Sequence, residues 1–144
     1  MKNIIIVIIL LFTVSGFSQS IVFEPRGNMD KPLPTISLYI SDNQKSELFE
    51  ERDEFAFFYF LEEKFFSVLK KAIDYRKTNN STNVDSDFGA YRIIYTDANG
   101  KQALDFMLSS HKESYIFFKE ILPLVSSNHY LHEEIEVLIR RLNY

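Results

Sequence analysis

The sequence predicts an α+β fold, in which a small antiparallel sheet packs against a long amphipathic helix and two C-terminal helices. Three patterns carry this prediction. Apolar and polar residues alternate near 36–41, as in a strand, and a hairpin pattern surrounds an Asn-Gly pair near 90–108. Helical apolar periodicity runs near 53–77 and returns over 110–144.

Residues 1–18 have the layout of a secretory signal peptide. A lysine precedes an apolar run at Ile4–Val14, and the small residues Gly16 and Ser18 lie just before a cleavage site at Gln19. The apolar run is shorter than the about 20 residues that a membrane-spanning helix needs. We therefore expect a cleaved leader and an exported chain that begins near Gln19. An uncleaved N-terminal anchor is the alternative.

Residue counts and charge narrow the class of protein. The sequence contains no cysteine, which excludes a disulfide, a lipid-modified cysteine and a cysteine nucleophile. Loss of the leader removes one of 16 basic residues and leaves 15 against 20 acidic ones, a net charge of −5. The basic residues form no stripe, which argues against nucleic-acid binding. No transmembrane helix is expected after cleavage, and the bias toward Ile, Phe, Tyr, Asn and Lys hints at a bacterial protein of the periplasm or the extracellular space.

The start of the exported chain is predicted to be an extended lead-in over 19–34, because it contains three prolines and a glycine. A short strand is possible at Ile21–Phe23. We expect a single α+β domain over 35–144, whose first strand alternates isoleucine and leucine with serine and tyrosine. The acidic segment 42–54 that follows is polar and irregular.

The segment "FAFFYFLEEKFF", residues 55–66, has seven aromatic side chains in twelve positions and fits two structures. As a strand, 55–61 would be apolar on both faces, as in a buried central strand. As a helix, its apolar stripe continues for several turns to Ile73. Acidic residues then lie at the helix start and basic ones near its end, where the dipole favours them. The longer pattern favours an amphipathic core helix near 53–77.

Two residues break the pattern of that helix. Phe60 falls on its polar half, where it either packs beneath a neighbouring loop or is an exposed docking aromatic. Glu62 falls on its apolar half, where it either reaches water at the edge of the stripe or is a buried carboxylate with a partner. We take Phe60 as the candidate partner-binding residue, because rigid aromatics carry much of the binding energy at interfaces.

A polar linker at 77–87 leads to the hairpin, whose turn we expect at Asn99-Gly100, the preferred pair for a two-residue type I′ turn. A two-residue loop makes one face wholly apolar through three cross-strand pairs: Tyr95–Leu104, Ile93–Phe106 and Tyr91–Leu108. A three-residue loop would place Ile93 opposite Asp105, because a slip of one residue reverses every side chain. A four-residue loop keeps the parity.

The last part of the chain is predicted to form two helices. The pattern Ser110-x-x-Glu113 is a capping box at the start of the first helix, and Pro123 kinks or ends that helix. Ser127 or Asn128 can cap the second helix. The apolar stripe of the second helix is Leu131, Ile135, Leu138 and Leu142.

The sequence signatures of common catalytic sites are missing. There is no G-x-S-x-G elbow, no P-loop, no G-x-G-x-x-G and no H-E-x-x-H. "DANGK" at 97–101 begins like a calcium loop but lacks the third oxygen ligand and the distal glutamate, so a hairpin turn explains it better. The carboxylates clustered at 47–54 are better explained as a solvated helix start than as an acid–base pair across a cleft. We expect no catalytic residue and no cofactor.

One cluster near the C-terminus has the composition of a metal site. His129 and His132 lie three residues apart, with Glu133 and Glu136 further along, and these ligand types bind Zn²⁺. The helix that buries the leucine stripe turns these residues away from the core, with His132 at the edge. We therefore expect a solvated face with local His–Glu pairs and no bound metal.

Three functions stay open on the sequence. The first is an exported, non-enzymatic protein that binds another envelope or secreted macromolecule, with an envelope protein as the candidate partner. The aromatic excess, the missing catalytic motifs and the acidic surface favour it. The second is a small hydrolase with an unrecognised carboxylate or histidine site. The third is a carrier of an apolar small ligand, lined by the Phe-rich helix and the hairpin.

Overall fold

The computed structural model describes residues 19–26, 33–40, 50–52, 55–78, 90–108, 110–127 and 129–143. The predicted leader at 1–18, the linker at 77–87 beyond its first two residues, and the side chains of the acidic segment at 47–54 lie outside this description.

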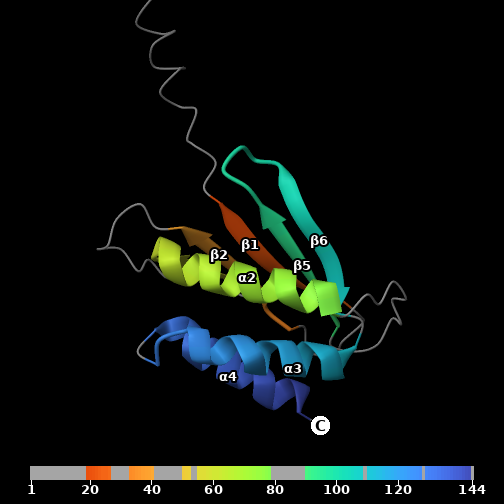
Figure 1. The fold of residues 1–144 in the computed structure, drawn as a ribbon. Coiled ribbons are helices and arrows are strands. Elements are labelled where there is room, and N and C mark those ends of the chain that lie inside the picture. The colour runs from red at the N-terminus through yellow and green to blue at the C-terminus, as the bar shows by residue number, and fades with distance from the viewer. Residues whose placement is uncertain are drawn as a thin grey trace, which may run out of the picture.

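The fold is α+β, as predicted, and its described residues form one sheet and three α-helices (Figure 1). The strand order is β3-β4-β2-β1-β5-β6. Helix α2 crosses over the strands, and α3 and α4 lie next to each other (Figure 1). The strands are β1 (Ser20–Arg26), β2 (Thr35–Ile40), β3 (Glu50–Arg52), β4 (Phe55–Phe60), β5 (Ala90–Thr96) and β6 (Gln102–Leu108). The helices are α2 (Glu62–Thr78), α3 (His111–Ile121), the short 3₁₀ helix η1 (Leu122–Leu124) and α4 (Tyr130–Leu142).

The sheet is mixed, whereas the prediction was a purely antiparallel sheet. β1 runs antiparallel to both β2 and β5, and the pairs β5–β6 and β3–β4 are antiparallel as well. β2 and β4 run parallel, with Leu38 beside Phe58. The parallel pair is absent from the prediction because the prediction assigns β4 to a helix.

Strand β1 lies in the middle of the sheet, although the sequence indicates only a short strand within a lead-in. Its whole length pairs with β5, and its first half pairs with β2. Ile21 and Phe23 are buried while Val22 is half-buried, which is the alternation of a strand with one face in the core. The folded unit therefore includes residues that precede 35.

The predicted long helix is wrong in its first part, because Phe55–Phe60 forms strand β4 and α2 begins only at Glu62. Phe58 and Phe60 are buried, whereas Tyr59 between them is exposed, as in a strand. The stretch is apolar throughout and fits either periodicity. Pairing with β2 on one side and β3 on the other favours the strand. Helix α2 starts with two acidic residues and ends with two basic ones, as the helix dipole favours.

The hairpin β5–β6 has the predicted register. Three cross-strand pairs are as expected: Tyr91–Leu108, Ile93–Phe106 and Tyr95–Leu104. Ile93 and Leu108 are fully buried toward the helices. Arg92 and Asp105 bond to each other on the opposite face.

The turn of the hairpin differs from the predicted two-residue turn. The Gly100 N–H donates to the Asp97 carbonyl and the Asp97 N–H to the Lys101 carbonyl, both at 2.9 Å, which encloses the three residues 98–100. Gly100 has a φ of 74°, a conformation that favours glycine. The register then shifts by one residue next to Tyr95. This bulge restores the parity that a three-residue loop would otherwise reverse.

The start and the end of helix α3 are as predicted. The Ser110 hydroxyl accepts a hydrogen bond from the Glu113 N–H at 3.2 Å, which satisfies one of the unpaired donors of the first turn. Pro123 lies just past the end of α3, within η1. The proline has no N–H to continue the helical hydrogen bonds.

The hydrophobic core lies between the sheet and the helices. Phe23 and Tyr91 both meet the ring of Phe118 edge to face, with centroids 5.6 and 4.9 Å away. The Tyr91 hydroxyl donates to the Pro34 carbonyl at 3.1 Å, and burial raises the pKa of this phenol far above its usual value. These contacts pack α3 against the strands β1 and β5 of the sheet.

Candidate functional site

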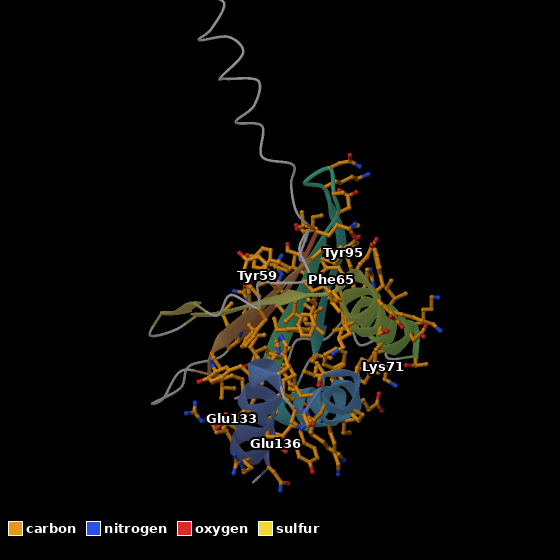
Figure 2. The ribbon with its side chains drawn as sticks, turned by 90° about the vertical axis from the view of Figure 1, so that its left-hand side faces the viewer. Tyr59, Phe65, Lys71, Tyr95, Glu133 and Glu136 are labelled. Carbon is orange, nitrogen blue, oxygen red and sulfur yellow. The ribbon has the colours of Figure 1, made fainter. Side chains whose placement is uncertain are left out.

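The two faces of the sheet differ in what covers them. On one face, Phe23 contacts Phe117 of α3, Tyr95 contacts Phe65 of α2, and Phe58 contacts Tyr130 of α4. We call the opposite face, which points away from α2 (Figure 2), the open face. By strand register its described side chains are Tyr59 of β4, Thr35, Ser37 and Tyr39 of β2, Ser20, Val22 and Glu24 of β1, Arg92, Ile94 and Thr96 of β5, and Gln102, Asp105 and Met107 of β6. Ser37, near the middle, is buried.

A pair of stacked tyrosines forms one end of the open face. Tyr39 and Tyr59 are register partners on the parallel strands β2 and β4. Their ring centroids are 5.4 Å apart with an interplanar angle of 28°. Tyr59 is 36% exposed and lies on the opposite side of the strands from Lys71 of α2 (Figure 2). Stacked tyrosines on a strand form a rigid, amphipathic surface that loses little conformational entropy when it binds.

A charged network forms the other end of the open face. The Arg92 guanidinium donates to both carboxylate oxygens of Asp105, at 2.8 and 2.7 Å, and lies 3.7 Å from the Glu24 carboxylate. The Gln102 amide donates to Asp105 at 2.7 Å. Between these charges and the tyrosines lie the half-buried side chains of Val22 and Ile94. The open face is therefore aromatic at one end, aliphatic in the middle and charged at the other end.

The charged network shifts the pKa values of its members. Hydrogen bonding to Arg92 lowers the pKa of the Asp105 carboxyl, and its attraction to the same guanidinium acts in the same direction. The hydrogen bond to Asp105 raises the pKa of Arg92. Both side chains are about one-third exposed, so solvent screens the pair and its contribution to stability is small.

Phe60, the predicted docking aromatic, is not exposed. It lies on the helix-bearing face of β4, is 2% exposed, and stacks on the His129 ring with centroids 4.7 Å apart. The expectation of exposure is wrong because the residue belongs to a strand and not to the polar side of a helix. A docking role that depends on its exposure therefore has no basis in this structure.

His129 is buried and acts as the N-cap of α4, where the sequence predicts Ser127 or Asn128. Its Nδ1 atom accepts a hydrogen bond from the Leu131 N–H at 3.1 Å. Its ring fills the space beside Phe60. The residue therefore stabilises the start of α4 and closes the core there, whereas the sequence predicts it on a solvated face.

The remaining metal candidates lie along α4. The His132 Nδ1 atom is 3.1 Å from the Val125 carbonyl, to which it donates, and its Nε2 atom is 3.7 Å from the Glu136 carboxylate. Glu133 and Glu136 are exposed on the helix (Figure 2). Over the described ranges, no three His, Asp or Glu side chains gather in a way that could hold a metal ion. Glu62, the other candidate carboxylate, is exposed in the first turn of α2.

The fold and the open face define a class of protein: a mixed sheet with helices on one side and an aromatic, partly apolar surface on the other. No family model, curated protein or solved structure matches the chain.

Within the part of the chain that the structure describes, none of the helices has both the length and the apolar character needed to cross a membrane.

The sequence alone does not reveal the tyrosine pair as a site. Tyr39 lies on the polar side of the predicted strand, and Tyr59 lies in the segment assigned to the helix. The two rings meet only because β2 and β4 pair in parallel. One feature of the sequence could have indicated the pair. If 55–61 is taken as a strand, Tyr59 lies on the opposite face from Phe58 and Phe60.

Proposed function

We propose that the protein is exported and, without catalysing a reaction, binds another protein of the bacterial cell envelope through its open face. The observation that carries this proposal is the stacked pair Tyr39–Tyr59 on a sheet face that points away from α2. Tyrosine is enriched among the residues that dominate binding energy, because it combines a large apolar ring with a hydroxyl that hydrogen-bonds at the rim.

The distribution of side chains on the open face supports a protein partner. Interfaces between proteins have an apolar centre and a polar rim that remains partly wet. Here Val22 lies on β1, the strand next to that of Tyr39, and Ile94 lies one strand further on, while the Arg92–Asp105 pair lies toward β6 at the edge. Arg92 and Asp105 already pair with each other. A partner that covers them therefore pays a smaller desolvation penalty than it would for two isolated ions.

The sequence supports export through its leader-like residues 1–18, and the fold is compatible with cleavage there. Strand β1 begins at Ser20, one residue after the proposed new N-terminus at Gln19. Cleavage at this point leaves every residue of the described sheet in the exported chain.

Site-specific photo-crosslinking in living cells tests the proposed surface. A photoreactive amino acid replaces Tyr59 on the open face or, as a matched control, Tyr130 at the start of α4, which is 44% exposed. We expect position 59 to give a covalent adduct with one envelope protein and position 130 to give none. Adducts of equal yield at both positions, or none at 59, would overturn the proposed surface.

The purified adduct partner then allows a measurement of affinity. Loss of a central aromatic residue commonly costs 2 kcal/mol or more, so Tyr59→Ala is expected to weaken binding by about 30-fold. Tyr130→Ala is expected to leave the affinity unchanged. An unchanged affinity in Tyr59→Ala would place the contact elsewhere on the molecule.

A further inference from the structure

The proposed cleavage site meets the fold at Gln19, the residue before β1. The Gln19 main-chain carbonyl accepts a hydrogen bond from the Ile40 N–H at 3.3 Å, which ties the residue to β2. Its side-chain oxygen, Oε1, accepts a hydrogen bond from the Tyr95 hydroxyl of β5 at 2.7 Å. The first residue of the exported chain is thus held through its backbone and through its side chain.

Tyr95 is fixed in this position from two sides. It is the register partner of Ile21 on β1, and its ring packs beside Phe65 of α2, with centroids 6.4 Å apart (Figure 2). Partial burial, and then repulsion from Asp97, raises the pKa of the Tyr95 phenol above its usual value. The hydroxyl therefore keeps its proton at neutral pH and remains a hydrogen-bond donor.

We infer that Gln19, once it is the first residue, cyclises to pyroglutamate, and that the Tyr95 hydroxyl promotes this modification by holding the side-chain carbonyl. The free α-nitrogen of Gln19 attacks the side-chain amide carbon, and a new C–N bond closes a five-membered lactam. The bond between that carbon and the side-chain nitrogen breaks. This nitrogen takes a proton from the α-amine and leaves as ammonia. The reaction needs no other reactant.

The hydrogen bond from Tyr95 is suited to this step. Negative charge develops on Oε1 as the carbonyl carbon becomes tetrahedral, so the hydrogen bond from the Tyr95 hydroxyl, which is already present before the reaction, strengthens as that charge grows. One hydrogen bond of ordinary net strength, if it acts in the transition state, corresponds to a rate difference of about tenfold. The lactam keeps the carbonyl, so Tyr95 can also donate to the product.

The modification changes the chemistry of the exposed N-terminus. A free α-amine is largely protonated at neutral pH, whereas the lactam is neutral and has no amine for an aminopeptidase to recognise. The inference rests on the proposed export, because only cleavage before Gln19 creates the reacting amine.

Intact-mass analysis tests both proposals with one sample. The full chain with its leader is produced in a bacterial host, and the mature protein is recovered from the envelope or the medium. We expect a chain that begins at Gln19 and is lighter by one ammonia, either on recovery or on incubation of the folded protein. A chain that retains Met1 would overturn export, and this inference with it. A chain that begins at Gln19 and keeps its ammonia would overturn the inference alone.

Three comparisons isolate the role of Tyr95. Tyr95→Phe is expected to cyclise about tenfold more slowly, while Tyr115→Phe on α3 cyclises like the wild type. Gln19→Asn is expected to show no loss of ammonia, which locates the reaction at residue 19. If Tyr95→Phe does not fold, the wild type in urea replaces it, since unfolding removes the hydrogen bond. Equal rates with and without this hydrogen bond would show that Tyr95 has no part in the reaction.

Discussion

Phe60 in β4 and Phe106 in β6 are the same residue type on the same face of one sheet, yet they differ in burial. Phe60 is 2% exposed, whereas Phe106 is only partly buried against the core. β6 is an edge strand, and β4 pairs with β3 only over Phe55–Phe57, so the described strand partner of Phe60 is Ile40 of β2. What distinguishes Phe60 is the His129 ring at the start of α4, which stacks on it. The element above the strand therefore determines burial, whereas alternation along the strand determines only the face.

The largest effect is expected from Phe60→Ala. Truncation of a fully buried phenylalanine removes its transfer free energy and leaves a cavity, so the free energy of unfolding should fall by about 3–5 kcal/mol. Urea denaturation measures this loss. Tyr59→Ala is the control, and because its ring lies on the open face we expect a loss below about 1 kcal/mol. A loss below about 1 kcal/mol for Phe60→Ala would contradict its place in the core.

Phe106→Ala should have a smaller effect than Phe60→Ala. Because the ring is only partly buried, its removal exposes less apolar surface, and we expect a loss of about 2 kcal/mol. The same urea denaturation series gives the value. If the two phenylalanine variants lose equal stability, the cover that His129 gives Phe60 has no energetic consequence and the comparison between the strands fails.

Gly100→Ala should cost about 1 kcal/mol, because alanine is strained at the positive φ of this residue. Asn99→Ala separates the two turn types. In a type I′ turn both central residues need positive φ, but Asn99 has none here. We therefore expect a loss within about 0.5 kcal/mol for Asn99→Ala. Equal losses at both positions would favour the two-residue turn.

Asp105→Asn should have a small effect, below about 1 kcal/mol at neutral pH, because the ion pair with Arg92 is partly exposed. The pH dependence of this stability difference tests whether the ion pair is its cause. The pKa of Asp105 is lowered in the folded state. Its stabilisation is therefore complete above the unfolded pKa of about 3.9 and is lost as the pH falls through the lower folded value.

Thermal denaturation at a series of pH values checks this sign. Below a pH of about 4 the wild type should lose the stabilisation from the Arg92–Asp105 ion pair. Asp105→Asn lacks this stabilisation at every pH, so the two curves of stability against pH should converge. Curves that stay parallel down to the lowest pH would show that the Arg92–Asp105 pair contributes nothing to folding.

The hairpin was predictable because only one register gives β5 and β6 a wholly apolar face. That face requires Ile93 opposite Phe106, and the structure has this pair. The turn was not predictable from Asn99-Gly100 alone. A bulge next to Tyr95 absorbs the extra residue of the loop, so both turns give the same apolar pairs and the hydrophobic pattern cannot distinguish them. The observed turn is stabilised by the Asp97 carboxylate, which accepts hydrogen bonds from the Asn99 and Lys101 N–H groups, both at 2.9 Å.

Strand β4 was not predictable from local periodicity, because a stretch that is apolar at every position fits a helix as well as a strand. Its partner β2 precedes it in the chain and pairs with it in parallel, a contact that no local pattern records. The candidate site depends on that same pairing, which places Tyr59 beside Tyr39. His129 was misplaced for a related reason, since its role as a cap follows only from the start of α4 at Tyr130.

The central position of β1 has a consequence for the order of folding. β1 is the first described strand to leave the ribosome, but its partners in β5 follow 64 to 76 residues later, from the Arg26–Ala90 pair to the Ser20–Thr96 pair. Contacts between residues so far apart slow folding, because the entropy of closing the loop is lost before the contact forms. A nascent chain of this kind stays unfolded for longer, which is the state in which a polypeptide can be threaded through a narrow translocation channel.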